Sequence, residues 1–146
     1  MSDTAHQPGW TGGQYSVYRA LLGAYLTWHF ARLLPWGGEV FSDRGVLPDG
    51  DLSPLLRLFP NPFLVADGPA AVTLVLCIGV LAALALALGW RDRIAAVVAW
   101  FVLAALFGRN PLIANPSLPY VGLLLLLHAG VPRAPYGSLE ARGRVA

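Results

Sequence analysis

The sequence predicts an all-α integral membrane protein in which four transmembrane helices form one bundle, with a short interfacial helix in the first long connection. Of its 146 residues, 56% are apolar and only 12% are charged, whereas an ordinary soluble domain has roughly 25% charged residues. Four apolar stretches alternate with turns rich in proline, glycine and asparagine. Because so few charges cannot cover the surface of a soluble domain of this size, we expect lipid to be the solvent.

The predicted spans are residues 15–34, 69–90, 92–109 and 117–131. Twenty helical residues rise about 30 Å, which matches the hydrocarbon thickness of a bilayer. The second span contains no charged residue at all. The third and fourth have shorter apolar runs, so the alternative for this pair is a re-entrant hairpin that is buried by protein.

These spans define a single membrane domain, residues 15–132, between a flexible tail (1–14) and a polar tail (133–146). Four spans place both termini and the turn after the second span on one side of the bilayer. The flanks on that side contain Arg19, Arg91, Arg93, Arg133, Arg142 and Arg144, and the opposite flanks contain Arg32, Arg44, Arg57 and Arg109. Because arginine favours the cytoplasmic side, we expect a bacterial inner-membrane protein with both termini in the cytoplasm.

The connection between the first two spans, residues 36–68, contains a sequence typical of a helix start. Ser53 is suited to be the N-cap and Pro54 the first helical residue. The following apolar piece is too short to cross a bilayer. We therefore expect an interfacial helix at about residues 54–59, ended by Pro60.

A polar stripe distinguishes the first span. Tyr18, Tyr25 and Arg32 recur every seven residues, and His29 lies between the last two, so all four fall on one helix face. Such a face is expected to line a cavity or the bundle interior rather than lipid. Tyrosine and histidine donate to carbonyl oxygens and arginine attracts anions, which predicts a pocket for a quinone or a lipid headgroup. The alternative is hydrogen bonding between helices, with Arg19 and Arg32 extending to the bilayer interfaces.

Arg109, Asn110 and His128 complete the candidate ligand-binding residues. Arg109 is expected at the end of the third span, where a cation complements the helix dipole. Asn110 begins a turn at the membrane surface. His128 lies near the end of the fourth span, where contact with interfacial water is the alternative.

Catalytic and metal sites are not expected. None of the three histidines has a partner at metal-ligand spacing, and no hydrolase elbow, phosphate loop or dinucleotide motif is present. All ten basic residues are arginine, which excludes chemistry that needs a lysine amine. They are scattered along the chain, so no nucleic-acid partner is expected.

The stretch GRNPLIANPS (Gly108–Ser117) and the following GLLLLLHAGVP resemble the HTTM (horizontally transferred transmembrane) family, which includes vitamin K-dependent gamma-carboxylase. The pieces YRALLGAYL, FSDRGVLP, LGWRDRIAAVVAW and YGSLEA are similar to the family in the same order. The family turn commonly reads Asn-Gly-Gly-Asp, whereas Asn115 is followed here by Pro116 and Ser117. The carboxylases also use a lysine base and a large extramembrane β-rich portion, both of which are missing here, so gamma-carboxylation by this chain is not expected.

The resemblance implies an HTTM-like accessory or scaffold subunit without catalysis of its own, or a module that binds a quinone or lipid. Its expected partners are the lipid bilayer and either a membrane protein or a second copy of the chain. The alternative is a small subunit of a quinone-linked membrane oxidoreductase, like the DoxX family, whose members also have four short helices. A third hypothesis is a transporter fragment that works only as an oligomer.

Overall fold

A computed structural model describes residues 12–113 and 115–130 of the chain. This part is all-helical and contains no strand. Its α-helices are α1 (Gly12–Leu33), α2 (Gly37–Phe41), α3 (Pro69–Leu88), α4 (Asp92–Arg109) and α5 (Leu118–Gly130). Three 3-10 helices, η1 (Gly50–Leu52), η2 (Pro62–Leu64) and η3 (Pro111–Ile113), lie in the connections. Of the two expected tails, residues 12–14 belong to α1, and residues 1–11 and 133–146 lie outside the described part.

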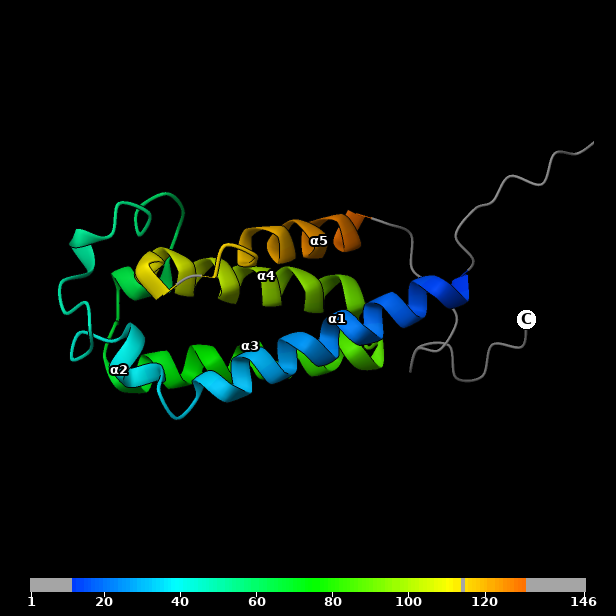
Figure 1. Cartoon of the computed structure of the whole chain (residues 1–146), viewed down its shortest axis with the longest axis horizontal. Helices are drawn as coiled ribbons and strands as arrows, with labels where there is room; N and C mark the ends of the chain where they lie inside the picture. The colour runs from blue at the N-terminus through cyan, green and yellow to red at the C-terminus, as the bar shows by residue number, and fades with distance from the viewer. Residues whose placement is uncertain (1–11, 114, 131–146) are drawn as a thin grey trace, which may run out of the picture.

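The four longer helices run along the long axis of the molecule (Figure 1). α1 packs against α3, α3 against α4, and α4 against α5, while the short α2 also packs on α3. The start of α1, the turn between α3 and α4 and the end of α5 lie at one end, which we call the Asp92 end. Residues 34–68 and 110–113 lie at the opposite end, which we call the connection end (Figure 1).

Local sequence explains where α3 begins and ends. Pro69 occupies the first turn after the Gly68 N-cap, where a missing backbone N–H costs nothing. Gly89 adopts a left-handed φ of 69°, and the N–H of Trp90 donates to the Ala85 carbonyl at 2.9 Å, a common way to end a helix. The helix therefore ends two residues before the expected position.

Small residues let the helices of the core approach closely. A Cβ at Gly23 of α1 would lie 2.6 Å from the Cα of Ala87 in α3. A Cβ at Gly79 of α3 would lie 2.9 Å from Cγ1 of Val102 in α4. Phe30, which is fully buried, also lies next to Gly79. The glycines thus set the spacing of α1, α3 and α4, and α1 and α4 line the cavity described below.

Helix length and composition do not support four transmembrane spans. Within the described residues, α3 is the one helix that is long and apolar enough to cross a membrane by itself. α4 contains Asp92, Arg93 and Arg109, and α5 has 13 residues. The structure therefore gives a helical protein with one candidate span, and the expected set of four spans is not reproduced.

The interfacial helix expected at residues 54–59 is replaced by turns. The N–H of Leu56 donates to Ser53 O and the N–H of Leu58 to Leu55 O, both at 3.2 Å. The Ser53 hydroxyl donates to the carbonyl of Gly108 at 2.5 Å instead of capping a helix. Leu56 is buried in the core, and Pro60 follows too soon for a helix to continue. The segment is thus tied to the end of α4 and does not form a separate interfacial element.

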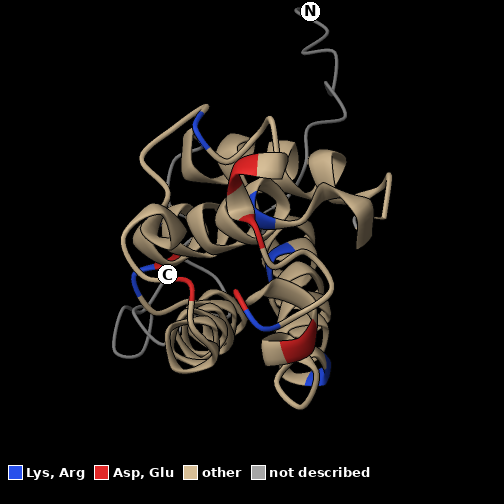
Figure 2. Cartoon of the chain, turned by 90° about the vertical axis from the view of Figure 1, so that its left-hand side faces the viewer, with Lys and Arg blue, Asp and Glu red and all other residues tan. Residues whose placement is uncertain are grey.

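Charged residues are concentrated at the connection end. An end-on view shows acidic and basic positions on the connecting segments around the ends of the helices (Figure 2). The connection holds Glu39, Asp43, Arg44, Asp49, Asp51, Arg57 and Asp67. The faces of α3 and α5 that point outward are covered instead by large apolar side chains.

Candidate ligand-binding cavity

A cavity of about 330 Å³ lies at the connection end between α1, α4 and the turn before α5. α1 contributes the most side chains to its wall, and α2, α4, η3 and the start of α5 supply the rest. The lining residues are Tyr25, Trp28, His29, Arg32, Leu33, Phe41, Leu103, Leu106, Phe107, Asn110, Ile113, Asn115 and Leu118. Its size falls in the range of ordinary small-molecule sites, roughly 300–1,000 Å³.

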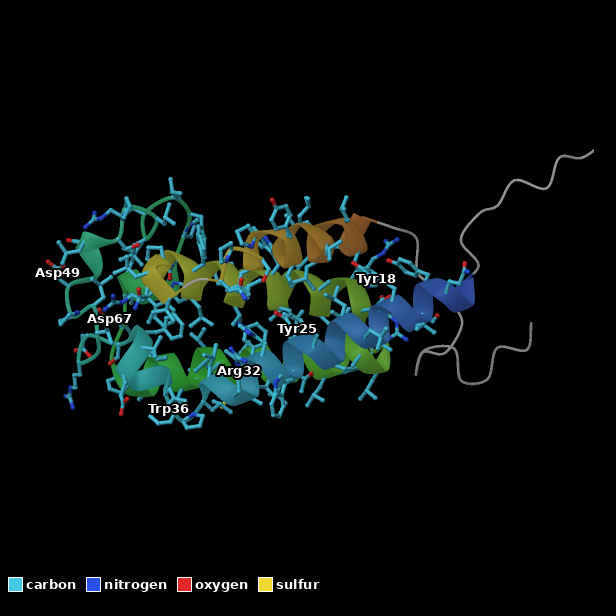
Figure 3. All side chains as sticks on the ribbon, in the orientation of Figure 1. Tyr18, Tyr25, Arg32, Trp36, Asp49 and Asp67 are labelled. Carbon is cyan, nitrogen blue, oxygen red and sulfur yellow. The ribbon has the colours of Figure 1, made fainter. Side chains whose placement is uncertain are left out.

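Three residues of the predicted polar stripe lie together in this wall. Tyr25, His29 and Arg32 follow one another at intervals of four and three along α1, which aligns them on one helix face. The rings of Tyr25 and His29 are stacked, with centroids 6.1 Å apart. Figure 3 shows Tyr25 and Arg32 along the half of α1 nearer the connection end. The helical spacing thus places the expected hydroxyl, imidazole and guanidinium in a single cavity.

The polar side chains of the wall are hydrogen-bond donors. Besides the three stripe residues these are Trp28, Asn110 and Asn115, and the lining contains no carboxylate. Within the described residues, no hydrogen bond engages the Tyr25 hydroxyl, the His29 ring or the Arg32 guanidinium. The cavity therefore offers unused donors and one fixed positive charge, which suits a ligand group with carbonyl or anionic oxygens.

Asn110 is held in the wall by two hydrogen bonds of its amide. Its Nδ2 donates to the carbonyl of Val40 at 2.8 Å, and its Oδ1 accepts from the N–H of Leu112 at 3.2 Å. One N–H of the amide remains for other contacts. Asn110 thus lines the cavity as expected, and it also joins the end of α4 to α2.

Arg109 does not line the cavity. Its side chain is fully buried and donates from Nη1 to Leu47 O at 2.9 Å and from Nη2 to Pro48 O at 3.3 Å. Nη2 also pairs with the Asp67 carboxylate at 3.3 Å. Arg109 lies in the last turn of α4, as expected, and its guanidinium also contacts the long connection because that connection folds back over the end of α4.

Two further polar contacts fix the same region and were not foreseen from the sequence. Asn61 Nδ2 donates to the Ala105 carbonyl at 3.1 Å, and Ser53 binds Gly108 as described above. By contrast, the Arg57–Asp51 pair, at 2.8 Å, is exposed, and the hydrogen bond to Asp51 raises the pKa of Arg57. Proline next to Asn61 and Ser53 was the available sign that these residues sit in ordered turns.

Tyr18 and His128 lie away from the cavity, at the Asp92 end. Tyr18 packs near Tyr15, with ring centroids 6.1 Å apart, and Figure 3 shows it far along α1 from Arg32. His128 is buried; its Nδ1 is 2.8 Å from the Tyr15 hydroxyl and its Nε2 is 3.6 Å from Asp92 Oδ2. Contact of His128 with interfacial water, the expected alternative, is therefore excluded in this structure.

Arg19 belongs to the same end, and its side chain is buried against the end of α3 instead of extending outward. Its side chain is 1% exposed, and Nη1 donates to the carbonyls of Leu86 and Ala87 at 2.7 and 2.9 Å. It thus occupies carbonyls at the end of α3. Periodicity within one helix could not predict these contacts, because they depend on which helices are neighbours.

The described residues contain no group of three or more His, Cys, Asp or Glu side chains that could hold a metal ion. Comparison of the chain with protein-family models, with characterised proteins and with solved structures gives no match. The resemblance to HTTM proteins therefore stays a prediction from the sequence.

Proposed function

We propose that this protein is an HTTM-like membrane protein that binds a lipid-soluble molecule through oxygen atoms of its polar head, without catalysing a reaction by itself. The observation that carries the proposal is the set of Tyr25, His29 and Arg32 on one wall of a 330 Å³ cavity. The head is a quinone carbonyl or an acidic lipid group, because both present acceptor oxygens to these donors.

The balance of polar and apolar groups in the cavity supports a ligand of this kind. Leu33, Phe41 and Leu106 cover the wall beside the donors, as in small-molecule sites, where a few polar groups orient a mostly apolar ligand. A positive charge without a nearby carboxylate favours an acidic head. A stacked tyrosine and histidine also suit the planar ring of a quinone.

The distribution of side chains over the surface supports insertion in a membrane. On α3, the outward-facing Leu74, Leu81 and Leu88 are all more than half exposed. Charged side chains of the flanking helices, Arg19 and Arg109, are instead buried and hydrogen-bonded. Ionisable groups in membrane helices face the protein interior in this way, so α1 and α4 are proposed to insert by packing on α3, and α5 by packing on α4.

The proposed location is a bacterial inner membrane with the Asp92 end at the cytoplasmic side. This orientation follows the arginine distribution and places the acidic connection outside. An accessory or scaffold role, with a membrane protein or a second copy as partner, follows from the resemblance to HTTM proteins. A DoxX-like oxidoreductase subunit is the rival, and it requires a redox partner.

The test is to identify what the protein binds after purification in mild detergent. Mass spectrometry of lipids, quinones and polypeptides that co-purify is expected to find a molecule with a carbonyl or acidic head. Tyr25→Phe, His29→Gln and Arg32→Gln should each lower its occupancy, Arg32→Gln most strongly for an acidic head. A co-purifying redox protein with quinone turnover would favour the rival.

Matched controls remove the same groups outside the cavity. Tyr120→Phe deletes a hydroxyl that is exposed on α5, and Arg44→Gln neutralises an exposed arginine of the connection. Both should keep the wild-type occupancy. If the cavity variants and the controls retain the molecule equally, the proposed site is wrong.

A further inference from the structure

A second cavity of about 270 Å³ adjoins the first one, between α4 and α5. It is lined by Trp100, Leu103, Ala104, Phe107, Leu118, Pro119, Gly122, Leu123 and Leu126. Leu103, Phe107 and Leu118 line both cavities, so these three side chains stand between them. We call the second cavity the α4–α5 groove.

The two cavities differ in chemical character. The first has donor groups from Tyr25, His29 and Arg32, whereas the lining of the α4–α5 groove is apolar apart from the indole N–H of Trp100. Leu123 and Leu126 of the groove are partly exposed at the surface of the molecule, at 54% and 44%. The first cavity, which contains hydrogen-bond donors, thus adjoins an apolar groove that is open at the surface of the molecule.

Gly122 creates the space in the groove. This residue is buried on the face of α5 that turns toward α4, and a Cβ placed on it would lie 3.5 Å from Cδ1 of Trp100. One methyl group would make ordinary contact there, but a larger side chain would fill the groove. Because Gly122 has no side chain, the space beside Trp100 on this face of α5 stays open.

We infer that the ligand is a single-tailed amphiphile, with its oxygen-bearing head among Tyr25, His29 and Arg32 and its hydrocarbon tail in the α4–α5 groove. The tail passes Leu103, Phe107 and Leu118, the side chains shared by both cavities. This inference rests on the proposed function and adds the shape of the ligand and the direction of its tail. A small polar solute would leave the groove empty, and a purely apolar one would offer no acceptor to the donors of Tyr25, His29 and Arg32.

The experiment compares head-only and tailed ligands with the same head, using protein in phosphatidylcholine nanodiscs and native mass spectrometry. One arm uses 2,3-dimethoxy-5-methylbenzoquinone and its decyl derivative; the other uses butanoic and dodecanoic acids. In the wild type we expect each tailed ligand to bind at least tenfold more tightly than its head-only relative. Binding of the benzoquinones alone would identify the head as a quinone carbonyl, and binding of the carboxylic acids alone would identify it as an acidic group.

Gly122→Leu should fill the groove and lower the affinity for the tailed ligand about tenfold, with head-only binding unchanged. Gly130→Leu is the matched control, because Gly130 lies on the same helix with no atom near its Cβ position. The tailed ligands partition into the lipid of the nanodisc equally for both variants. The difference in affinity between Gly122→Leu and Gly130→Leu therefore measures the contribution of the groove.

A second pair of variants tests the groove independently, in case Gly122→Leu does not fold. Leu126→Asn places a polar group in the groove, and Leu127→Asn places it on the exposed neighbour that does not line the groove. Only Leu126→Asn should weaken tailed ligands. If head-only ligands bind but the groove variants leave the advantage of the tail intact, the inference is overturned and the proposed function stands. If neither series binds the wild type, both are overturned.

Discussion

The hydroxyl of Tyr15 and Nδ1 of His128, 113 positions apart in the chain, lie 2.8 Å from each other. Their rings are also stacked, with centroids 5.3 Å apart. The pair joins the start of α1 to the end of α5, and Asp92 from α4 lies 3.6 Å from the other ring nitrogen of His128. This end of the molecule is therefore closed by side-chain contacts, whereas the cavity occupies the opposite end.

Removing the Tyr15 hydroxyl should loosen α5. Tyr15→Phe keeps the ring but deletes the hydrogen bond to His128, so we expect the free energy of unfolding to fall by about 1 kcal/mol. Thermal unfolding of the purified protein in detergent measures the change. Tyr120→Phe, which deletes an exposed hydroxyl on α5, should leave the midpoint unaltered. Equal midpoints for both variants would show that the hydrogen bond contributes nothing.

Neutralising Arg109 should destabilise the connection end. Arg109→Gln removes a buried charge that serves two carbonyls and Asp67, and hydrogen bonds to charged groups contribute roughly 1.5–3 kcal/mol. We expect faster limited proteolysis of residues 43–67 and a lower unfolding midpoint. Arg57→Gln breaks an exposed ion pair and should change neither, because such pairs contribute little. Identical proteolysis patterns would contradict the role assigned to Arg109.

Enlarging Gly23 should separate α1 from α3. In Gly23→Ala the new methyl would overlap the backbone of Ala87, and overpacking of this kind costs about 1–3 kcal/mol. Gly130→Ala introduces the same methyl into open space and should be tolerated. Unfolding midpoints and the detergent-soluble yield provide the comparison, and a tolerated Gly23→Ala would mean that the helices pack less closely than described.

Charge in the middle of α3 should hinder membrane integration. Leu81 is 66% exposed at mid-helix and Leu88 is 54% exposed at the helix end. An arginine at a helix centre costs about 2.5–3.5 kcal/mol of insertion free energy, whereas one at the end reaches the interface. We expect Leu81→Arg, and not Leu88→Arg, to reduce the fraction that stays in membranes after alkaline extraction. In a protein surrounded by water both changes would be harmless, and the wild type would be extracted.

The helices could be predicted largely from the sequence because their boundaries depend on neighbouring residues. α4 has the expected bounds, and α3 begins at Pro69 as expected. The grouping of Tyr25, His29 and Arg32 was predictable for the same reason, since it requires only helical periodicity. Tyr18 shares their angular position but lies about 10 Å further along the helix axis, which separates it from the cavity.

The contacts between helices could not be predicted in this way. Arg19 binds the end of α3, and His128 reaches Tyr15 and Asp92, because the fold brings those elements together. The turns at residues 54–59 likewise depend on Gly108, whose carbonyl takes the hydroxyl of Ser53. Neighbouring residues indicate approximately where the long helices begin and end, but the partner of a buried polar group depends on packing.

Tryptophans in the walls of the two cavities make the intrinsic fluorescence of the protein a measure of ligand binding. Trp28 lies in the wall of the first cavity and Trp100 in that of the α4–α5 groove. The chain has five tryptophans, so the contributions of these two are obtained by difference from variants that lack one of them. Replacing each in turn by phenylalanine assigns the fluorescence change, so an unlabelled sample can reveal the order in which head and tail arrive.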